Sequence, residues 1–473
     1  MKITNWKDER GVSLVIALLT MVIISLLAAG IIFVSRTETT TTANYKQLAQ
    51  ARYAAEAGVQ RTVNWLQNNY TAPTSSAPFN SAAVPVKCAS GCTTNGAAVV
   101  LSAISGVPSN YPDSAVASAY NTALSNQPLT DLSTATYSTS ATLVSMGGNG
   151  VSWLGTTGAV QTWRITSQGN IAGIVAATVQ VNATFERGGT PIFGYAVFAT
   201  GTACPTINFS SSGYTDSYDS SLGSYASTVQ TTGGDIGTNG SLTMSGSSTI
   251  NGNAYLVNVV TTGSCPTKTF NNGSSNGVTG NGGAPTAMGA PKTFDNPVYT
   301  NPSPALTTSS GYSSNVTLTP GNYPNVTISG GKTLTISPGT YNFNSLKLSG
   351  GSDITVSPAG SVVIYIAGAG PPAKAVDFSG GSITNGGGTP GSFQIVYSGS
   401  AQMVLSGGSS SAAVVYAPNS DITMSGSSPW YGSIIGKTFT NSGGSAVHYD
   451  RSLGNSLVVA GSFQLTGFTW NKF

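Results

Sequence analysis

The chain has 473 residues, enough for two to four domains with substantial cores. Only 7% of the residues are charged, against about 25% in ordinary soluble domains, and 59 are glycine. Because 40% are hydrophobic and the net charge is only +3, the composition disfavours charge-driven disorder. An enzyme rich in acid–base groups is also hard to build from this inventory, which holds one histidine, His448.

The charges are unevenly placed along the chain. Residues 1–66 carry seven cations and four anions, whereas the rest of the chain carries eleven of each sign. A surface that binds nucleic acid needs clustered lysine and arginine. The sequence therefore predicts no nucleic-acid partner.

The first structural signal is an uncharged apolar run from Val12 to Val34. A helix of this length spans about 35 Å, enough to cross a hydrocarbon core of about 30 Å. Cationic residues precede it, so we expect the N-terminus in the cytoplasm and the chain after Arg36 outside. The alternative is a cleaved secretory signal, for which residues 28–30 (Ala-Ala-Gly) offer a small-residue cleavage site.

The helical pattern continues beyond the apolar run. Apolar residues recur on one helical face, at spacings of mostly three, four and seven. They are Tyr45, Leu48, Ala55, Val59, Val63 and Leu66. The pattern predicts one helix from about Val12 to Asn68 whose second half packs on a domain. The β-branched run Thr39–Thr42 is its weakest point.

Two motifs in this region resemble those of type IV pilin-like proteins, most closely the PilX N-terminal family of minor pilins. They are residues 10–19 (RGVSLVIALL) and residues 53–58 (YAAEAG), which include Glu56. The resemblance implies that a prepilin peptidase of the bacterial inner membrane cleaves between Gly11 and Val12. It also implies that the membrane helix then assembles with other pilins in a filament.

Ile16 departs from the pattern of major pilins, whose fifth mature residue is usually glutamate. In a filament that carboxylate is thought to pair with the N-terminal ammonium of a neighbouring subunit, because an unpaired buried charge is costly. A subunit without it fits best where no such neighbour exists. The substitution favours a minor subunit at the filament tip.

The middle of the chain contains the four cysteines. We expect two disulfides, Cys88–Cys92 and Cys204–Cys265, which would agree with an oxidising compartment. The alternative is a four-thiolate metal site, but only one pair is close in sequence. Further on, strict alternation from Thr178 to Phe185 predicts an antiparallel strand paired with 160–167 across a turn at 169–170.

From about Pro191 the sequence consists of short apolar triplets bounded by Gly, Ser, Asn and Pro, such as Leu334-Thr335-Ile336 and Ile354-Thr355-Val356. Such triplets bury two side chains inward and gain a core only by stacking. Their spacing favours a parallel β-helix, with a β-sandwich as the rival fold. The C-terminal part also resembles the β-helical domain attached to such pilin-like N-termini.

Candidate site residues have simpler interpretations beside them. His448 and Asp450 would share one strand face, but no nucleophile motif accompanies them, so a structural role is favoured. Asp216 and Asp219 offer oxygen ligands for calcium but lack a glycine-defined loop. We expect no catalytic residue, no metal and no cofactor.

The sequence therefore predicts an α+β protein in four parts. They are a leader peptide (1–11), a long helix (12–69, with 12–34 transmembrane), a pilin-like αβ domain (70–190) and a Gly/Ser/Thr-rich parallel β-helix, or solenoid (191–473). The predicted function is that of a minor pilin, held in the inner membrane and exposing its β-helical head at the pilus or cell surface for assembly or adhesion. A surface or glycan receptor would be its partner. The alternatives are a β-helical carbohydrate-active enzyme and an envelope-anchored protein that never assembles.

Overall fold

The computed structural model describes residues 9–73, 77–130, 132–155, 159–172, 176–257, 270–272, 277–300, 309–358, 360–369, 374–386, 388–405 and 411–472. These residues form two compact units. The first comprises residues 1–146, 161–188 and 462–473, and the second comprises residues 147–160 and 189–461. Both units are thus discontinuous in sequence, whereas the predicted domains 70–190 and 191–473 were contiguous.

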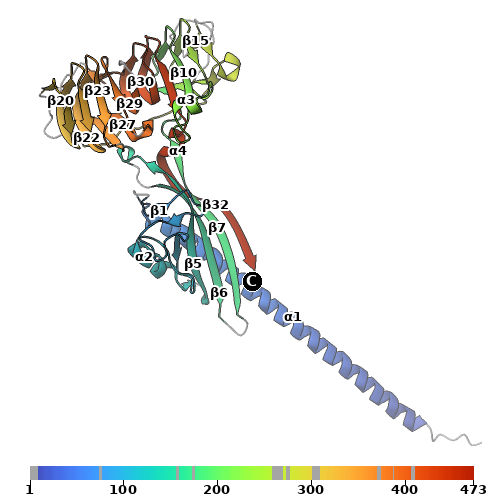
Figure 1. The fold of residues 1–473 in the computed structure, drawn as a ribbon. Helices are drawn as coiled ribbons and strands as arrows, with labels where there is room; N and C mark the ends of the chain where they lie inside the picture. The colour runs from blue at the N-terminus through green and yellow to red at the C-terminus, as the bar shows by residue number, and fades with distance from the viewer. Residues whose placement is uncertain are drawn as a thin grey trace, which may run out of the picture. The chain divides into compact units, whose positions relative to one another are not determined.

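The N-terminal helix α1 (Glu9–Asn68) is continuous over 60 residues, as Figure 1 shows. Threonine does not interrupt it, because the hydroxyls of Thr37, Thr39 and Thr40 donate to the carbonyl groups four residues earlier. These bonds hold the side chains against the helix and satisfy them locally. The residues from 12 to 46 are all exposed, so Tyr45 does not belong to the packed face that the periodicity predicted.

The second half of α1 packs on the first unit. Ala51, Ala55, Val59 and Leu66 are completely buried there, as the periodicity predicted for three of them. Trp65 meets the ring of Tyr120 edge to face, with 5.1 Å between ring centroids. Helical stability in this region therefore comes from burial of one apolar face.

The sheet strands of the first unit are long, and several continue into residues of the second. The elements with residues in the first unit are β1 (Phe79–Asn80), β2 (Lys87–Cys88), β3 (Val100–Ser102), α2 (Ser114–Leu124), β4 (Gln127–Leu129), β5 (Leu132–Gly150), β6 (Ala159–Ile171), β7 (Ala177–Pro191) and β32 (Leu457–Lys472). Strands β6 and β7 pair antiparallel from Gln161–Arg187 to Ile171–Ala177. The predicted pairing is confirmed, but residues 169–170 lie inside β6 and do not form the turn.

Gly169 serves close packing. A Cβ atom at this position would lie 2.0 Å from the carbonyl oxygen of Ala51 and 2.5 Å from the backbone nitrogen of Ala55. Gly58, on the helix, has the same role, since a Cβ there would lie 2.2 Å from the Ser167 hydroxyl. Glycine at these two positions lets the helix backbone approach the sheet.

The second unit consists mainly of short parallel strands. Val316 pairs with Leu334, and Leu334 pairs in turn with Ile354. Every described pairing in its 20-stranded sheet and in the four-stranded sheet β19-β21-β23-β26 is parallel, which excludes the antiparallel β-sandwich. Leu334 and Ile336 are completely buried while Thr335 between them is half-buried, as the triplet pattern predicted.

The elements of the second unit follow in chain order. They are η1 (Ser152–Leu154), β8 (Val197–Ala199), β9 (Ile207–Phe209), β10 (Tyr214–Tyr218), α3 (Tyr225–Thr228), β11 (Ile236–Thr238), β12 (Leu242–Met244), β13 (Thr249–Ile250), β14 (Ala254–Leu256), β15 (Phe270–Asn272), β16 (Gly277–Val278), η2 (Gly280–Gly283), β17 (Thr286–Ala287), β18 (Ser309–Tyr312), β19 (Val316–Leu318), β20 (Gly321–Ile328), β21 (Thr333–Ile336), β22 (Gly339–Leu348), β23 (Ser352–Val356), β24 (Val362–Ile366), β25 (Lys374–Asp377), β26 (Gly381–Thr384), η3 (Pro390–Ser392), β27 (Phe393–Tyr397), β28 (Gln402–Val404), β29 (Ser411–Met424), β30 (Trp430–Asn441), β31 (Ala446–Asp450) and α4 (Leu453–Ser456).

Strands from the beginning and the end of the second unit lie side by side. Strand β8 pairs with both β11 and β30, and β10 pairs with both β13 and β31. The first strands of the unit are thus inserted between its last strands and the next ones in sequence. This order closes the pairing path of a large, barrel-like parallel sheet.

Replacing Gly169 with alanine should separate α1 from the sheet, because the new methyl group overlaps backbone atoms that have no rotamer to change. We expect the free energy of unfolding to fall by about 3 kcal/mol. Urea denaturation of the detergent-solubilised protein measures the change. Gly188→Ala is the matched control, since a Cβ atom there meets nothing within 4 Å. Equal stability of the two variants would contradict the packing role.

Candidate functional site

Among the residues that the structure describes, none packs against the apolar half of α1. Val12 is 61% exposed and Phe33 is 74% exposed, and none of the most apolar window is buried. By length and composition this helix can cross a membrane. Exposed apolar surface costs about 25 cal/mol per Å² in water, so the segment requires lipid or other apolar helices around it.

The few polar residues in this half are compatible with such surroundings. The Thr20 hydroxyl donates to the carbonyl groups of Ile16 and Ala17, and the Ser25 hydroxyl donates to that of Met21 at 2.7 Å. An unsatisfied hydroxyl in hydrocarbon would be costly. These two side chains therefore need no partner outside the helix.

The residues singled out for processing and assembly all lie on α1. Gly11 lies in its first turn, and the Ile16 side chain is 55% exposed. Glu56 lies in the packed half, where its carboxylate accepts from Arg52 Nε at 2.8 Å. This pair is partly exposed and spans one helical turn, so its contribution to stability is small.

The first predicted disulfide is confirmed. Cys88, the last residue of β2, is bonded to Cys92, with 6.3 Å between their Cα atoms. The second pairing involves Cys265, which lies outside the described residues, so Cys204–Cys265 stays a prediction.

His448 bonds to Asp216 and not to Asp450. Strands β10 and β31 pair parallel and in register, which places Asp216 directly opposite His448. The His448 Nδ1 and Asp216 Oδ1 atoms are 2.5 Å apart, and both side chains are almost fully buried. The other Asp216 oxygen accepts from the Tyr225 hydroxyl at 2.7 Å. His448 and Asp450, which we predicted to share one strand face, therefore have different bonding partners.

The remaining carboxylates of this region bond to loop hydroxyls. Asp450 accepts from the backbone nitrogen and hydroxyl of both Ser220 and Ser452. Asp219 accepts from the nitrogen and hydroxyl of Ser221. Arg451 donates to the hydroxyl of Ser217, on the opposite strand. Asp216 and Asp219 thus bond to different residues. Their bonds do not support the shared calcium site that we considered from the sequence.

Tyrosines surround the His448–Asp216 pair. The Tyr225 and Tyr431 rings lie 4.1 Å and 4.7 Å from the imidazole, measured between centroids. Burial raises the pKa of Tyr225 well above its usual range, and the carboxylate of Asp216, which accepts its hydroxyl hydrogen, raises it further. Burial also raises the pKa of Tyr218, with the charge of Asp450 as a second cause. The raised pKa values favour the neutral form of both tyrosines.

Comparison with known proteins identifies the N-terminal segment. Residues 10–60 match the PilX N-terminal family, and residues 300–456 match a domain of unknown function, DUF7305. The N-terminal helix of the chain is therefore pilin-like. No curated protein matches the chain.

Two solved structures are similar to this chain, both with low sequence identity and a low TM-score. The competence-associated pilin ComZ from Thermus thermophilus has 13% sequence identity and a TM-score of 0.23, covering 90% of this chain and 98% of that one. The DUF3494 domain of ice-binding protein 1 from Shewanella frigidimarina has 14% identity and a TM-score of 0.23, covering 55% and 99% respectively.

The sequence predicted the long N-terminal helix but did not predict the His448–Asp216 pair. The two residues are 232 positions apart, and their contact depends on the register between β10 and β31. Each residue had been noticed with a nearer partner, Asp450 or Asp219. No spacing rule connects strands from opposite ends of a unit.

The buried tyrosines predict alkaline sensitivity. A folded-state pKa raised above the unfolded value of about 10 contributes stability below that pH, and this stability is lost as the pH rises further. We expect the free energy of unfolding to fall above about pH 10, with a smaller slope in Tyr218→Phe. Urea denaturation at stepped pH, with tyrosinate absorbance, measures both. Tyr45→Phe, on exposed helix, is the control, and an unchanged slope in Tyr218→Phe would contradict the assignment.

Proposed function

We propose that this protein is a minor pilin that enters a filament through residues 12–34 and carries its β-rich domain to the tip for assembly or adhesion. One observation carries the proposal. The helix matched to the PilX N-terminal family has an apolar half that none of the described residues of the first unit covers. Neighbouring pilin helices in a filament, and the inner membrane before assembly, would supply the missing apolar surroundings.

Processing and topology follow from the same helix. A prepilin peptidase would cleave between Gly11 and Val12, so that Val12 becomes the mature N-terminus. Lys2, Lys7 and Arg10 precede the apolar run and favour a cytoplasmic N-terminus, with a single pass and the C-terminus outside. The Cys88–Cys92 disulfide agrees with an oxidising compartment for the first unit.

The tip position rests on Ile16. In this proposal the subunit cannot neutralise the N-terminal ammonium of a neighbour, because an isoleucine stands where a major pilin has its carboxylate. A buried ammonium without a partner is expensive in an apolar bundle. The subunit is therefore favoured at the end of a filament and disfavoured along the shaft.

For the second unit we infer a β-helical head with a non-enzymatic role. In-register parallel pairing at intervals of about 20 residues supports the β-helix. The engagement of His448 with Asp216, beneath tyrosine rings, supports a structural use of this histidine. The head would contact a surface or glycan receptor, and nucleic acid is not among its partners.

Substitution of Gly11 by tryptophan tests processing. A bulky residue before the cleavage site should block the peptidase, so the protein should keep its leader. Mass spectrometry of membrane fractions compares the variant with Gly30→Ala, a control position where a Cβ atom meets nothing within 4 Å. A mature mass unchanged in Gly11→Trp would refute the leader assignment.

The Ile16→Glu variant tests the position in the filament. A carboxylate here should allow internal incorporation, so labelled heads should move from tips to shafts when filaments are examined by electron microscopy. Ile16→Gln is the uncharged control and should stay at the tips. Heads found along shafts in the unmodified protein would contradict the tip proposal. Their absence from sheared filaments would instead favour a statically anchored envelope protein.

A further inference from the structure

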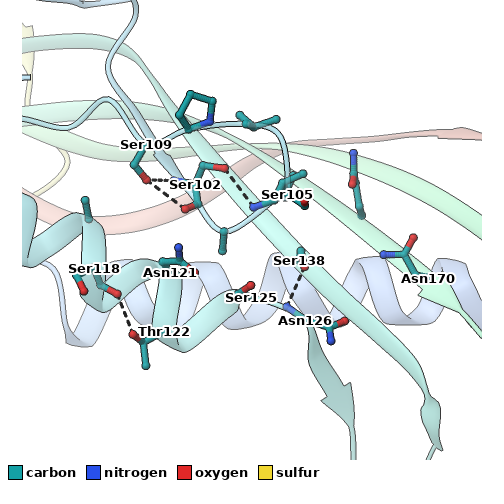
Figure 2. Close-up of a pocket in the computed structure, with 16 residues that line it drawn as sticks. Ser102, Ser105, Ser109, Ser118, Asn121, Thr122, Ser125, Asn126, Ser138 and Asn170 are labelled. Carbon is teal, nitrogen blue, oxygen red and sulfur yellow. Dashed lines mark hydrogen bonds between the residues drawn. The ribbon is translucent and has the colours of Figure 1, made fainter. Parts of the chain in front are cut away.

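A polar groove lies beside helix α2 in the first unit, with a volume of about 810 Å³. Figure 2 shows Ser118, Asn121 and Thr122 of α2 on one side and the segment holding Ser102, Ser105 and Ser109 on the other. The volume lies within the range of small-molecule sites, about 300–1,000 Å³. None of the processing or assembly residues of α1 lines this groove.

The described residues that line the groove include no charged side chain. Its polar groups are hydroxyls and side-chain amides. The amides come from α2, from the segment that follows it and from β6. Asn121 lies on α2, Asn126 follows it, and Gln168 and Asn170 lie on β6. Such a surface offers no ion-pair partner to an acidic or basic ligand, so it selects for a neutral one.

Several of these polar groups are available to a ligand. Within the described residues, the side-chain amides of Asn121, Asn126 and Gln168 have no hydrogen-bond partner. The Ser109 hydroxyl, in contrast, accepts from the backbone nitrogen of Ser102 and donates to its carbonyl oxygen. Each amide presents a donor and an acceptor side by side. Adjacent hydroxyl groups of a sugar ring present the complementary pair.

Asn126 is held in place by its backbone. Its φ angle is +46°, in the left-handed region, and its nitrogen donates to the Ser138 hydroxyl at 2.9 Å. Figure 2 shows this bond at the end of α2. A non-glycine residue in this conformation costs free energy, and such residues are concentrated at binding sites.

The groove also has an apolar part. Ile104, Val107 and Pro108 line it, and Val107 is 43% exposed. The C–H face of a sugar ring can pack on such a surface while its hydroxyls meet the amides. An extended peptide fits less well, because one edge of β3 is paired with β5 and the other edge already bonds to Ser109 and Asn110.

We propose that this groove binds a neutral oligosaccharide. The inference adds a ligand site in the first unit to the adhesion that the proposed function assigns to the head, and it rests on that function only for its biological use. Because none of the described lining residues is aromatic, they offer no ring for stacking, and we expect an affinity of roughly millimolar for one site. Many copies on filaments or cells would supply avidity.

A glycan array tests the proposal with the full-length protein in detergent micelles. Its probes are neutral tetrasaccharides of glucose, galactose and N-acetylglucosamine, their sialylated counterparts and an uncharged extended peptide. We expect binding of at least one neutral tetrasaccharide, little changed between low and high salt. Binding of only sialylated probes, only the peptide, or nothing would overturn the proposal.

The double variant Asn121→Ala/Gln168→Ala locates the site. Loss of two amide contacts should weaken binding at least tenfold, as measured by calorimetry. Gln60→Ala, an exposed amide on α1 outside the groove, should bind as the unmodified protein does. Equal binding by the double variant would place the site elsewhere and refute the groove. The double variant should still enter filaments, so failure of this inference is distinct from failure of the pilin proposal.

Discussion

The exposed apolar half of α1 is the constraint on which the rest of this structure depends. A helix of this kind is unstable in water, and no described residue of the first unit covers residues 12–34. Its threonine and serine side chains bond back to their own helix, which removes the need for water. The segment is therefore suited to lipid and to other apolar helices, the two environments that a pilin meets.

The other half of the same helix shows how a single element can serve two environments. Between Gln47 and Asn68 the residues alternate between buried and exposed positions, and the buried face is made of small side chains at Ala51, Ala54 and Ala55. Small residues on the helix meet glycine on the sheet, so the two backbones approach closely. Close approach gives a rigid base for the apolar half, because there is little side-chain freedom at the contact.

The second unit concentrates charge where distant strands meet. Asp216, His448, Asp450 and Arg451 all lie along β10 and β31 or directly after them, and each bonds across to the other segment. These bonds join residues about 230 positions apart, in the same region where β8 and β9 pair with the distant strand β30. Buried polar pairs of this kind cost desolvation, but their geometry favours one register over others.

The sequence by itself determined the features that depend on local order. Periodicity defined the helix, alternation defined the pairing of β6 with β7, and apolar triplets indicated stacked parallel strands, because these patterns follow from repeat geometry. Only the tertiary structure decided which distant residues meet. We predicted a turn at Gly169, because the helix residues against which it packs lie more than 100 positions away in sequence and were not recognisable as its neighbours. His448 and Asp216 meet because β10 is inserted beside β31, and the groove forms because residues of α2, of β6 and of the segment after β3 line one space. Contacts of this kind are set by register and packing between separate segments, which no single stretch of sequence contains.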